Sequence, residues 1–283
     1  MGRAGTIAVI GVVGLWQGAR AADACNTGMS VQECARVLSK LGSIYYSQAR
    51  YREAEPLFKR AIGLWPADDQ GSAEFAILQH NLAAAYRAEG QDRKAVEAYE
   101  RALRIRESLY GSNANELSPL LDGLGEAALA EGDRKLAGRM FHRAESIDQQ
   151  NLAPDDLRLA YDAYNAGALA FARKQYPSAE AHFQRCLAIF ERHLEASDPE
   201  LGTALASLAA VYRREGQLED SARLYEKAIE ILRQNFGPEN PRLLSTLQDF
   251  SALLRARKEF AEAEMLDTQA MKIRVTQALR NGR

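Results

Sequence analysis

The sequence predicts an all-α protein built from stacked helical repeats. A small residue returns at intervals of 41 or 42 residues, and a large aromatic side chain follows it by four positions in five of six copies. A second small residue comes three positions later. A fixed period of this length is typical of solenoids, in which each repeat is one supersecondary unit. The residues that mark the period are Ala54, Ala95, Ala137, Ala179, Ser221 and Ala263.

The composition is that of a folded protein without a strongly charged surface. The chain has 283 residues, of which 36 are basic, 38 are acidic and 47% are hydrophobic. The balanced charge does not favour a surface for nucleic acid or an anionic membrane. The hydrophobic content argues against a disordered chain.

Residues 1–24 have the pattern of a secretory signal peptide. Arg3 supplies a positive start, an apolar stretch covers residues 6–16, and small-x-small sites end at Ala21 and Ala24. The apolar stretch is short for a bilayer crossing. We therefore expect cleavage after Ala21 or Ala24 and a periplasmic or secreted mature protein. An uncleaved membrane anchor is the alternative.

Residues 25–35 form a lead-in to the first repeat. Ser30 and Glu33 have the spacing of a capping box, which predicts that a helix starts at about Val31. Cys25 and Cys34 flank this box and could form a disulfide in an exported protein. Cys186 takes a small-residue position that is Ala in the other five repeats, so we expect a buried free thiol there.

Each repeat is predicted to contain two amphipathic helices separated by a short turn. Leu82 and Tyr86 lie on one face of the first helix in the second repeat, and Ala95 and Tyr99 lie on one face of its second helix. Gly90 stands between them, where the chain needs a left-handed residue to turn. Gly132 and Gly216 occupy the same position in two other repeats.

Breaks also recur between repeats. Asp198–Pro199 and Asn240–Pro241 each combine a capping side chain with a proline suited to the first helical position. The repeat array is expected to cover residues 36–283. Its repeats are placed at about 36–76, 77–118, 119–160, 161–202, 203–244 and 245–283.

This pattern resembles the tetratricopeptide repeat, in the 42-residue form typical of kinesin light chains. Residues 53–61 (EAEPLFKRA), 81–83 (NLA) and 102–107 (ALRIRE) carry the resemblance. It implies a right-handed superhelical solenoid of six helix-turn-helix repeats, whose first helices line a concave groove for an extended peptide or a partner helix. Asp267 replaces the aromatic residue in the last repeat, which we interpret as part of a polar capping face.

Counting back from each periodic small residue identifies the side chains that would face this groove. Asn81 and Asn165 occupy the same position, where an amide can both donate to and accept from a peptide backbone. The candidate partner-binding residues are Tyr46, His80, Asn81, Arg87, Tyr161, Tyr164, Asn165, Phe171, Arg213, Arg214 and Arg255.

Two groups within this set suggest the chemistry of the partner. Tyr161, Tyr164 and Phe171 would form an aromatic patch in the middle of the groove. Arg213, Arg214 and Arg255 would make its C-terminal end basic and suited to carboxylates. We therefore expect an extended, partly acidic segment of another protein in the groove.

Catalysis has little support in the sequence. The four histidines lack metal-ligand spacing, and neither a glycine-rich phosphate loop nor a nucleophile elbow occurs. Asp122 and Glu126 lie one helical turn apart, which more often indicates a solvated pair than an acid–base pair. We expect no enzymatic activity, cofactor, metal, nucleic acid or small-molecule substrate, and membrane contact only through the transient signal peptide.

These observations predict a non-catalytic scaffold for protein–protein interaction in the bacterial cell envelope. An intracellular signalling or regulatory adaptor of the same fold, which would keep its N-terminus, is one alternative. An accessory subunit of an envelope enzyme is another.

Overall fold

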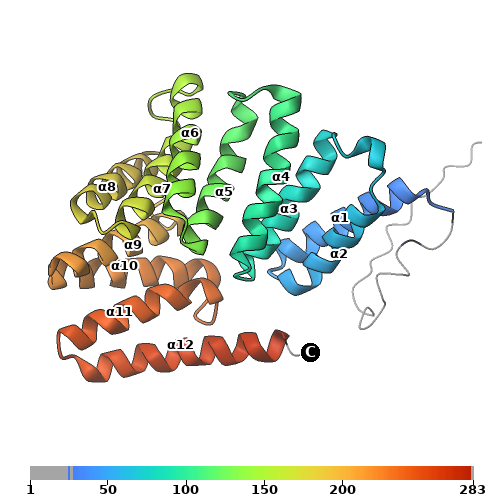
Figure 1. Ribbon diagram of the computed structural model, residues 1–283. Coiled ribbons are helices and arrows are strands. Elements are labelled where there is room, and N and C mark those ends of the chain that lie inside the picture. Colours follow the sequence, from blue (N-terminus) through green and yellow to red (C-terminus); the bar gives the residue numbers. More distant parts are fainter. Residues whose placement is uncertain (1–24, 26–27, 282–283) are drawn as a thin grey trace, which may run out of the picture.

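The repeated helical pairs follow one another around an arc, from α1–α2 to α11–α12 (Figure 1). The computed structural model describes residue 25 and residues 28–281. Within these residues the chain forms twelve α-helices and three short 3-10 turns, and no strand. The expected signal peptide lies outside the described residues.

The helices pair as hairpins, one for each predicted repeat. The first helices are α1 (Val31–Ser47), α3 (Ala73–Ala88), α5 (Ser118–Glu131), α7 (Arg158–Ala172), α9 (Pro199–Glu215) and α11 (Leu244–Ala256). Their partners are α2 (Tyr51–Leu64), α4 (Asp92–Tyr110), α6 (Arg134–Asn151), α8 (Tyr176–His193), α10 (Leu218–Phe236) and α12 (Phe260–Asn281). The turns η2 (Ala67–Asp69), η3 (Asn115–Leu117) and η4 (Pro241–Leu243) precede α3, α5 and α11. The predicted all-α solenoid of six helix-turn-helix repeats is confirmed.

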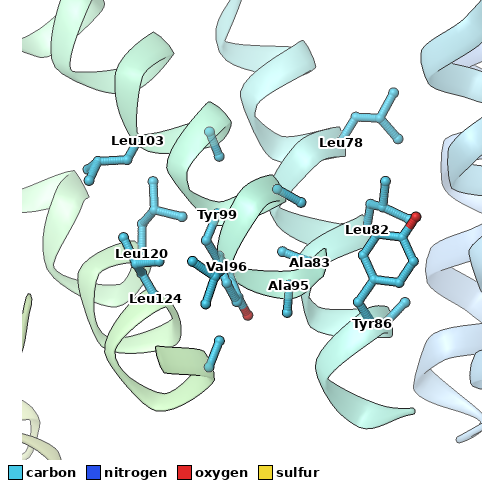
Figure 2. Packing of buried hydrophobic residues seen from close by; sticks show 14 of the residues in the cluster. Leu78, Leu82, Ala83, Tyr86, Ala95, Val96, Tyr99, Leu103, Leu120 and Leu124 are labelled. Atoms are coloured by element: carbon cyan, nitrogen blue, oxygen red, sulfur yellow. The ribbon is translucent and has the colours of Figure 1, made fainter. Parts of the chain in front are cut away.

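The periodic small residues lie where the helices of a pair approach each other. All six are completely buried. Figure 2 shows Ala95 of α4 beside Ala83 of α3, while Tyr99 extends toward Leu120 and Leu124 of α5. A larger side chain at the contact would push the two backbones apart, because protein interiors leave little empty space. The period therefore marks positions that are buried in every hairpin, and in the second repeat one of them lies at the contact between the two helices.

The aromatic residues of the second helices rest on small residues of the first helices. A Cβ atom added to Gly125 would lie 2.4 Å from the ring of Phe141, and one added to Gly167 would lie 2.8 Å from the ring of Phe183. Neither position has room for a side chain unless the ring moves. The glycines thus allow each aromatic ring to lie directly on the backbone of its paired helix.

The turn inside each hairpin uses a left-handed residue in all six repeats. The predicted glycines adopt it, with φ of 70° at Gly90, 99° at Gly132 and 82° at Gly216. The other three repeats place a residue with a side chain at the same position, with φ of 57° at Ala49, 61° at Lys174 and 67° at Lys258. Because a Cβ atom is disfavoured in this conformation, helix packing and not residue type sets the turn there.

The lead-in caps the first helix through hydrogen bonds and is also joined to it by a disulfide bond. The Ser30 hydroxyl accepts a hydrogen bond from the Glu33 amide at 3.2 Å, and the Glu33 carboxylate accepts one from the Ser30 amide at 2.7 Å. This capping box starts α1 at Val31, as predicted. A disulfide bond links Cys25 to Cys34. Cys186 is a buried free thiol, and burial raises its pKa to about 12.

The hydrophobic core divides between the third and fourth repeats. One cluster of buried side chains runs through the first three repeats and includes Leu169 as its single buried member from the fourth. A second cluster begins at Leu159, and a third begins at Ala209. The second and third clusters share Ala206 and Leu224 as packing neighbours. The buried core therefore divides at two places, between the third and fourth repeats and within the fifth repeat.

Candidate partner-binding groove

Polar side chains connect each first helix to the first helix of the next repeat. We call these contacts the groove ladder. Each of the five junctions has at least one such contact within the described residues. They are Asn81–Ser43 (3.4 Å), Arg87–Glu126, Asn165–Asp122 (2.9 Å), Tyr164–Ser207 (3.1 Å) and Arg213–Asp249 (3.2 Å).

In the first three repeats, the predicted groove residues make contacts with other side chains of this chain. Arg87 forms an ion pair with Glu126. The ring of His80 packs edge-on against Tyr99, with centroids 5.4 Å apart. Burial lowers the pKa of His80 to about 4, so the imidazole is neutral at physiological pH. Tyr46 packs against Tyr51 at 5.2 Å, and its burial raises its pKa.

The two asparagines serve the ladder. Asn81 donates to Ser43 of the preceding repeat. Asn165 is only 4% exposed, and its amide donates to Asp122 of the preceding repeat. Both side chains therefore contact the preceding repeat, although at different positions of it, and the Asn165 amide has little surface to offer a ligand.

A hollow of about 280 Å³ lies on the groove face of the last three repeats. Its lining includes the predicted residues Tyr164 and Phe171, and others at the equivalent groove-facing positions of α9 and α11. The hollow's lining residues are Tyr164, Ala168, Phe171, Phe183, Thr203, Ala206, Ser207, Ala210, Leu232, Arg242, Ser245, Thr246 and Asp249.

Small side chains create this space. Ala168 and Ala210 occupy the position that holds Glu126 in the third repeat. Ala206 occupies the position that holds His80 in the second repeat. Because these alanines are small, they leave a concave site between α7, α9 and α11.

The hollow combines an apolar floor with a polar rim. Phe171 packs against Tyr176 at 5.7 Å, and the Tyr164 ring lies 5.5 Å from that of Phe183. Arg242 places its guanidinium 4.6 Å from the centre of the Phe236 ring. Such an arrangement suits a segment with an apolar side chain beside polar backbone or charge.

The charges near the hollow are partly compensated. Asp249 accepts from Arg213, and burial raises the pKa of Asp249 while Arg213 and Arg214 oppose this effect. Arg255 forms an ion pair with Asp267 of the same repeat. Arg214 is exposed. Of the three arginines predicted for the C-terminal end of the groove, Arg213 and Arg255 therefore already contact carboxylates of this chain.

The structure separates Tyr161 from the other two aromatic residues of the predicted patch. Tyr161 packs edge-on against Phe190 at 5.3 Å and is 38% exposed. It is not among the residues that line the hollow. Tyr164 and Phe171, in contrast, lie together in the lining.

Sequence reasoning missed Arg242 and Ser207. Arg242 lies in η4, outside the helical positions that were counted, but it precedes the groove-facing Ser245 by one helical turn. Ser207 occupies the position of Asn81 and Asn165 in its own repeat, and this shared position was a usable signal.

The described residues also bear on metal binding and membrane insertion. No group of three or more His, Cys, Asp or Glu side chains in this part of the chain could hold a metal ion. None of the helices described has the length and apolar character needed to cross a bilayer.

Comparison with known structures agrees with this architecture. TPR-like repeats assigned to a kinesin light chain of Podosopora anserina match with a TM-score of 0.54 and 21% identity, over 73% of this chain and 98% of theirs. A Rap protein complexed with competence and sporulation factor matches with a TM-score of 0.61 and 17% identity, over 89% and 77% of the two chains. The Cut9–Hcn1 structure matches with a TM-score of 0.62 and 15% identity, over 84% of this chain and 40% of the other.

Comparison of the sequence with protein-family models identifies the family, which the structural matches alone do not. No curated protein matches the sequence significantly. Tetratricopeptide repeat models match residues 34–65, 74–150, 117–192 and 200–274, which together span most of the chain. The chain therefore belongs to the tetratricopeptide repeat family.

Proposed function

We propose that this protein is a non-catalytic scaffold that binds an extended segment of another protein, with the hollow as its main contact. The hollow itself carries the proposal, because it is the concave site where apolar, hydroxyl and charged groups converge. An extended segment can place one large apolar side chain between Phe171 and Ala210 while its backbone reaches the rim hydroxyls.

The proposed segment is partly acidic. Arg242 lines the hollow, and Arg214 lies exposed on the neighbouring helix α9. A partner carboxylate near these guanidinium groups gains charge-assisted hydrogen bonds. Asp249 is held by Arg213, which limits its repulsion of such a partner.

The fold alone does not exclude catalysis, since a structure named aspartyl phosphate phosphatase F from Bacillus subtilis has a similar fold, with a TM-score of 0.61 at 16% identity. The scaffold role is supported instead by the contacts of two groups whose pKa values are strongly shifted, His80 and Tyr99. His80 and Tyr99 pack on each other, and burial is the main cause of both pKa shifts. Because His80 lies on α3 and Tyr99 on α4, these groups contribute to packing within the second repeat.

Filling the hollow tests the proposal without removing an existing contact. Peptides of about ten residues, enough to span three repeats in extended form, are selected from a random display library on the wild-type protein. Ala210→Phe is expected to weaken the selected peptides by at least about tenfold, because the new ring occupies the space of the ligand. Fluorescence anisotropy with labelled peptides measures the change.

Ala84→Phe is the matched control. Ala84 occupies the equivalent position in the second repeat and does not line the hollow. This variant should bind the same peptides as the wild type. Equal loss in both variants, or full binding by a folded Ala210→Phe protein, would contradict a binding site in the hollow.

We further propose that the protein is exported to the bacterial cell envelope. The signal-peptide pattern of residues 1–24 supports export, and so does the Cys25–Cys34 disulfide, since disulfides persist in oxidising compartments. Mass spectrometry of the protein from its native host should find Ala22 or Cys25 at the N-terminus. An intact Met1 would refute cleavage and favour the alternative of an intracellular adaptor.

A further inference from the structure

Three carboxylic acids lie near one another where the fourth repeat packs on the third. Asp122 comes from α5, Asp148 from α6 and Asp162 from α7, and each pair of them interacts electrostatically. Asp148 and Asp162 are 1% and 4% exposed.

These buried acids replace apolar packing residues. The position of Asp162 is occupied in other repeats by the buried residues Leu78, Leu120 and Ala204. The position of Asp148 is occupied in other repeats by the buried residues Trp65, Phe190 and Leu232. At the position of Asp162 this junction is polar where the neighbouring junctions are apolar, whereas the position of Asp148 holds Arg106 in the second repeat. The hydrophobic core divides at the junction.

Two of the three acids have hydrogen-bond partners. Asp148 accepts from the Ser118 hydroxyl at 2.7 Å and from the Arg158 guanidinium at 2.9 Å. Asp122 accepts from Asn165 at 2.9 Å. In the described part of the chain, neither carboxyl oxygen of Asp162 makes a hydrogen bond. A buried, unpaired carboxylate is costly, and a proton removes its charge.

The charges around Asp162 favour the neutral form. Burial raises the pKa of Asp162 to about 8, and the neighbouring acids add to the effect. Burial likewise raises the pKa of Asp122 to about 7. The charged groups that act on these two residues are Asp122, Glu126, Glu145, Asp148, Asp162 and Arg158. Arg158, the basic member of this set, donates to Asp148, while Glu126 and Glu145 pair with Arg87 and Arg185.

We propose that the junction between the third and fourth repeats is a proton-controlled hinge, in which α7 packs against α5 and α6 while Asp162 is protonated and ionised Asp162 loosens the two halves of the solenoid. In a solenoid, each interface between repeats contributes its own stability term, so one weak interface can open while the repeats on either side stay folded. The groove crosses this junction, and its geometry therefore changes when the hinge opens.

The direction of the pH dependence follows from the raised pKa. The closed state binds the Asp162 proton more tightly than the open state, where the carboxyl returns toward its ordinary value of 3.8. The stabilisation is therefore complete below that value and is lost as the pH rises through about 8. Each pH unit in this interval favours opening by up to about tenfold for one proton.

Hydrogen–deuterium exchange of the full chain tests the hinge between about pH 5 and about pH 9, with rates corrected for intrinsic exchange. In the wild type, protection factors in α6 and α7 should fall by up to about tenfold per pH unit, while those in α3 and α4 change much less. Asp162→Asn, which is nearly isosteric and uncharged, should remove the part of this pH dependence that Asp162 contributes and leave the smaller part due to Asp122. Asp162→Leu restores the residue type of Leu78 and Leu120 and should raise protection at high pH.

Asp155→Asn is the matched control, because Asp155 is exposed in the loop before α7. It should keep the wild-type pH profile. Constant protection of α6 and α7 in the wild type would overturn the hinge, and so would an unchanged profile in Asp162→Asn. The wild-type profile decides the question even if a variant does not fold. Peptide binding in the hollow is tested separately by Ala210→Phe, so either proposal can fail alone.

Discussion

The two halves of the groove have the same helical repeats but carry different side chains at equivalent positions. In the first three repeats, His80, Arg87 and Glu126 contact neighbouring side chains and occupy the groove face. In the last three, Ala206 and Ala210 leave a hollow at equivalent positions. The residues that pack inside the hairpins and the residues of the groove face therefore vary independently, because they lie on opposite faces of the first helices.

The largest effects are expected for the buried aromatic residues of the second helices, and the loss of stability should be equal in both halves. Phe141→Ala in the third repeat and Phe183→Ala in the fourth should each cost about 3–5 kcal/mol, since both rings are buried and rest on glycine. Urea denaturation followed by circular dichroism measures the loss. A difference of more than about 2 kcal/mol between the variants would show that the halves are not packed alike.

A smaller effect is expected at the hairpin turns, where the halves differ. The left-handed residues are Lys174, Gly216 and Lys258 in the last three repeats and Ala49, Gly90 and Gly132 in the first three, so lysine takes this position in the C-terminal half alone. Lys174→Gly and Lys258→Gly should each stabilise the protein by about 0.5–1 kcal/mol, because the Cβ strain is removed.

Gly132→Ala is the opposing control and should destabilise by about 1 kcal/mol, as its φ of 99° disfavours a side chain. Thermal unfolding of the three variants measures these changes. Destabilisation by both lysine-to-glycine substitutions would mean that the lysine side chains contribute more than their backbone strain costs.

Much of the fold was predictable from local and periodic signals. The helix start at Val31 follows from Ser30 and Glu33, which lie within one turn of each other. The turns at Gly90 and Gly132 follow from their position between two amphipathic segments. Burial of Cys186 follows from its alignment with alanine in the other repeats. Each of these depends on neighbours in sequence or on the repeat frame.

The candidate site was only partly predictable. Tyr164 and Phe171 do line the hollow, but the burial of Asn165 and the role of Arg242 came from contacts between repeats. The burial of Asp162 could not be predicted from the sequence either. Its repeat position holds buried leucine in other repeats, which suggests burial, whereas its charge suggests exposure. Whether such a residue is buried depends on how closely adjacent repeats pack.

The sequence by itself determined the architecture of this protein, because its regular period places the same small and aromatic residues at equivalent positions and so produces the same packing within each helical hairpin. Only the tertiary structure decided which groove side chains bind one another and which leave space. Those contacts join helices about 40 residues apart in sequence, as Asn165 and Asp122 do at a separation of 43. Their distances depend on the stacking of whole repeats, which no local pattern encodes.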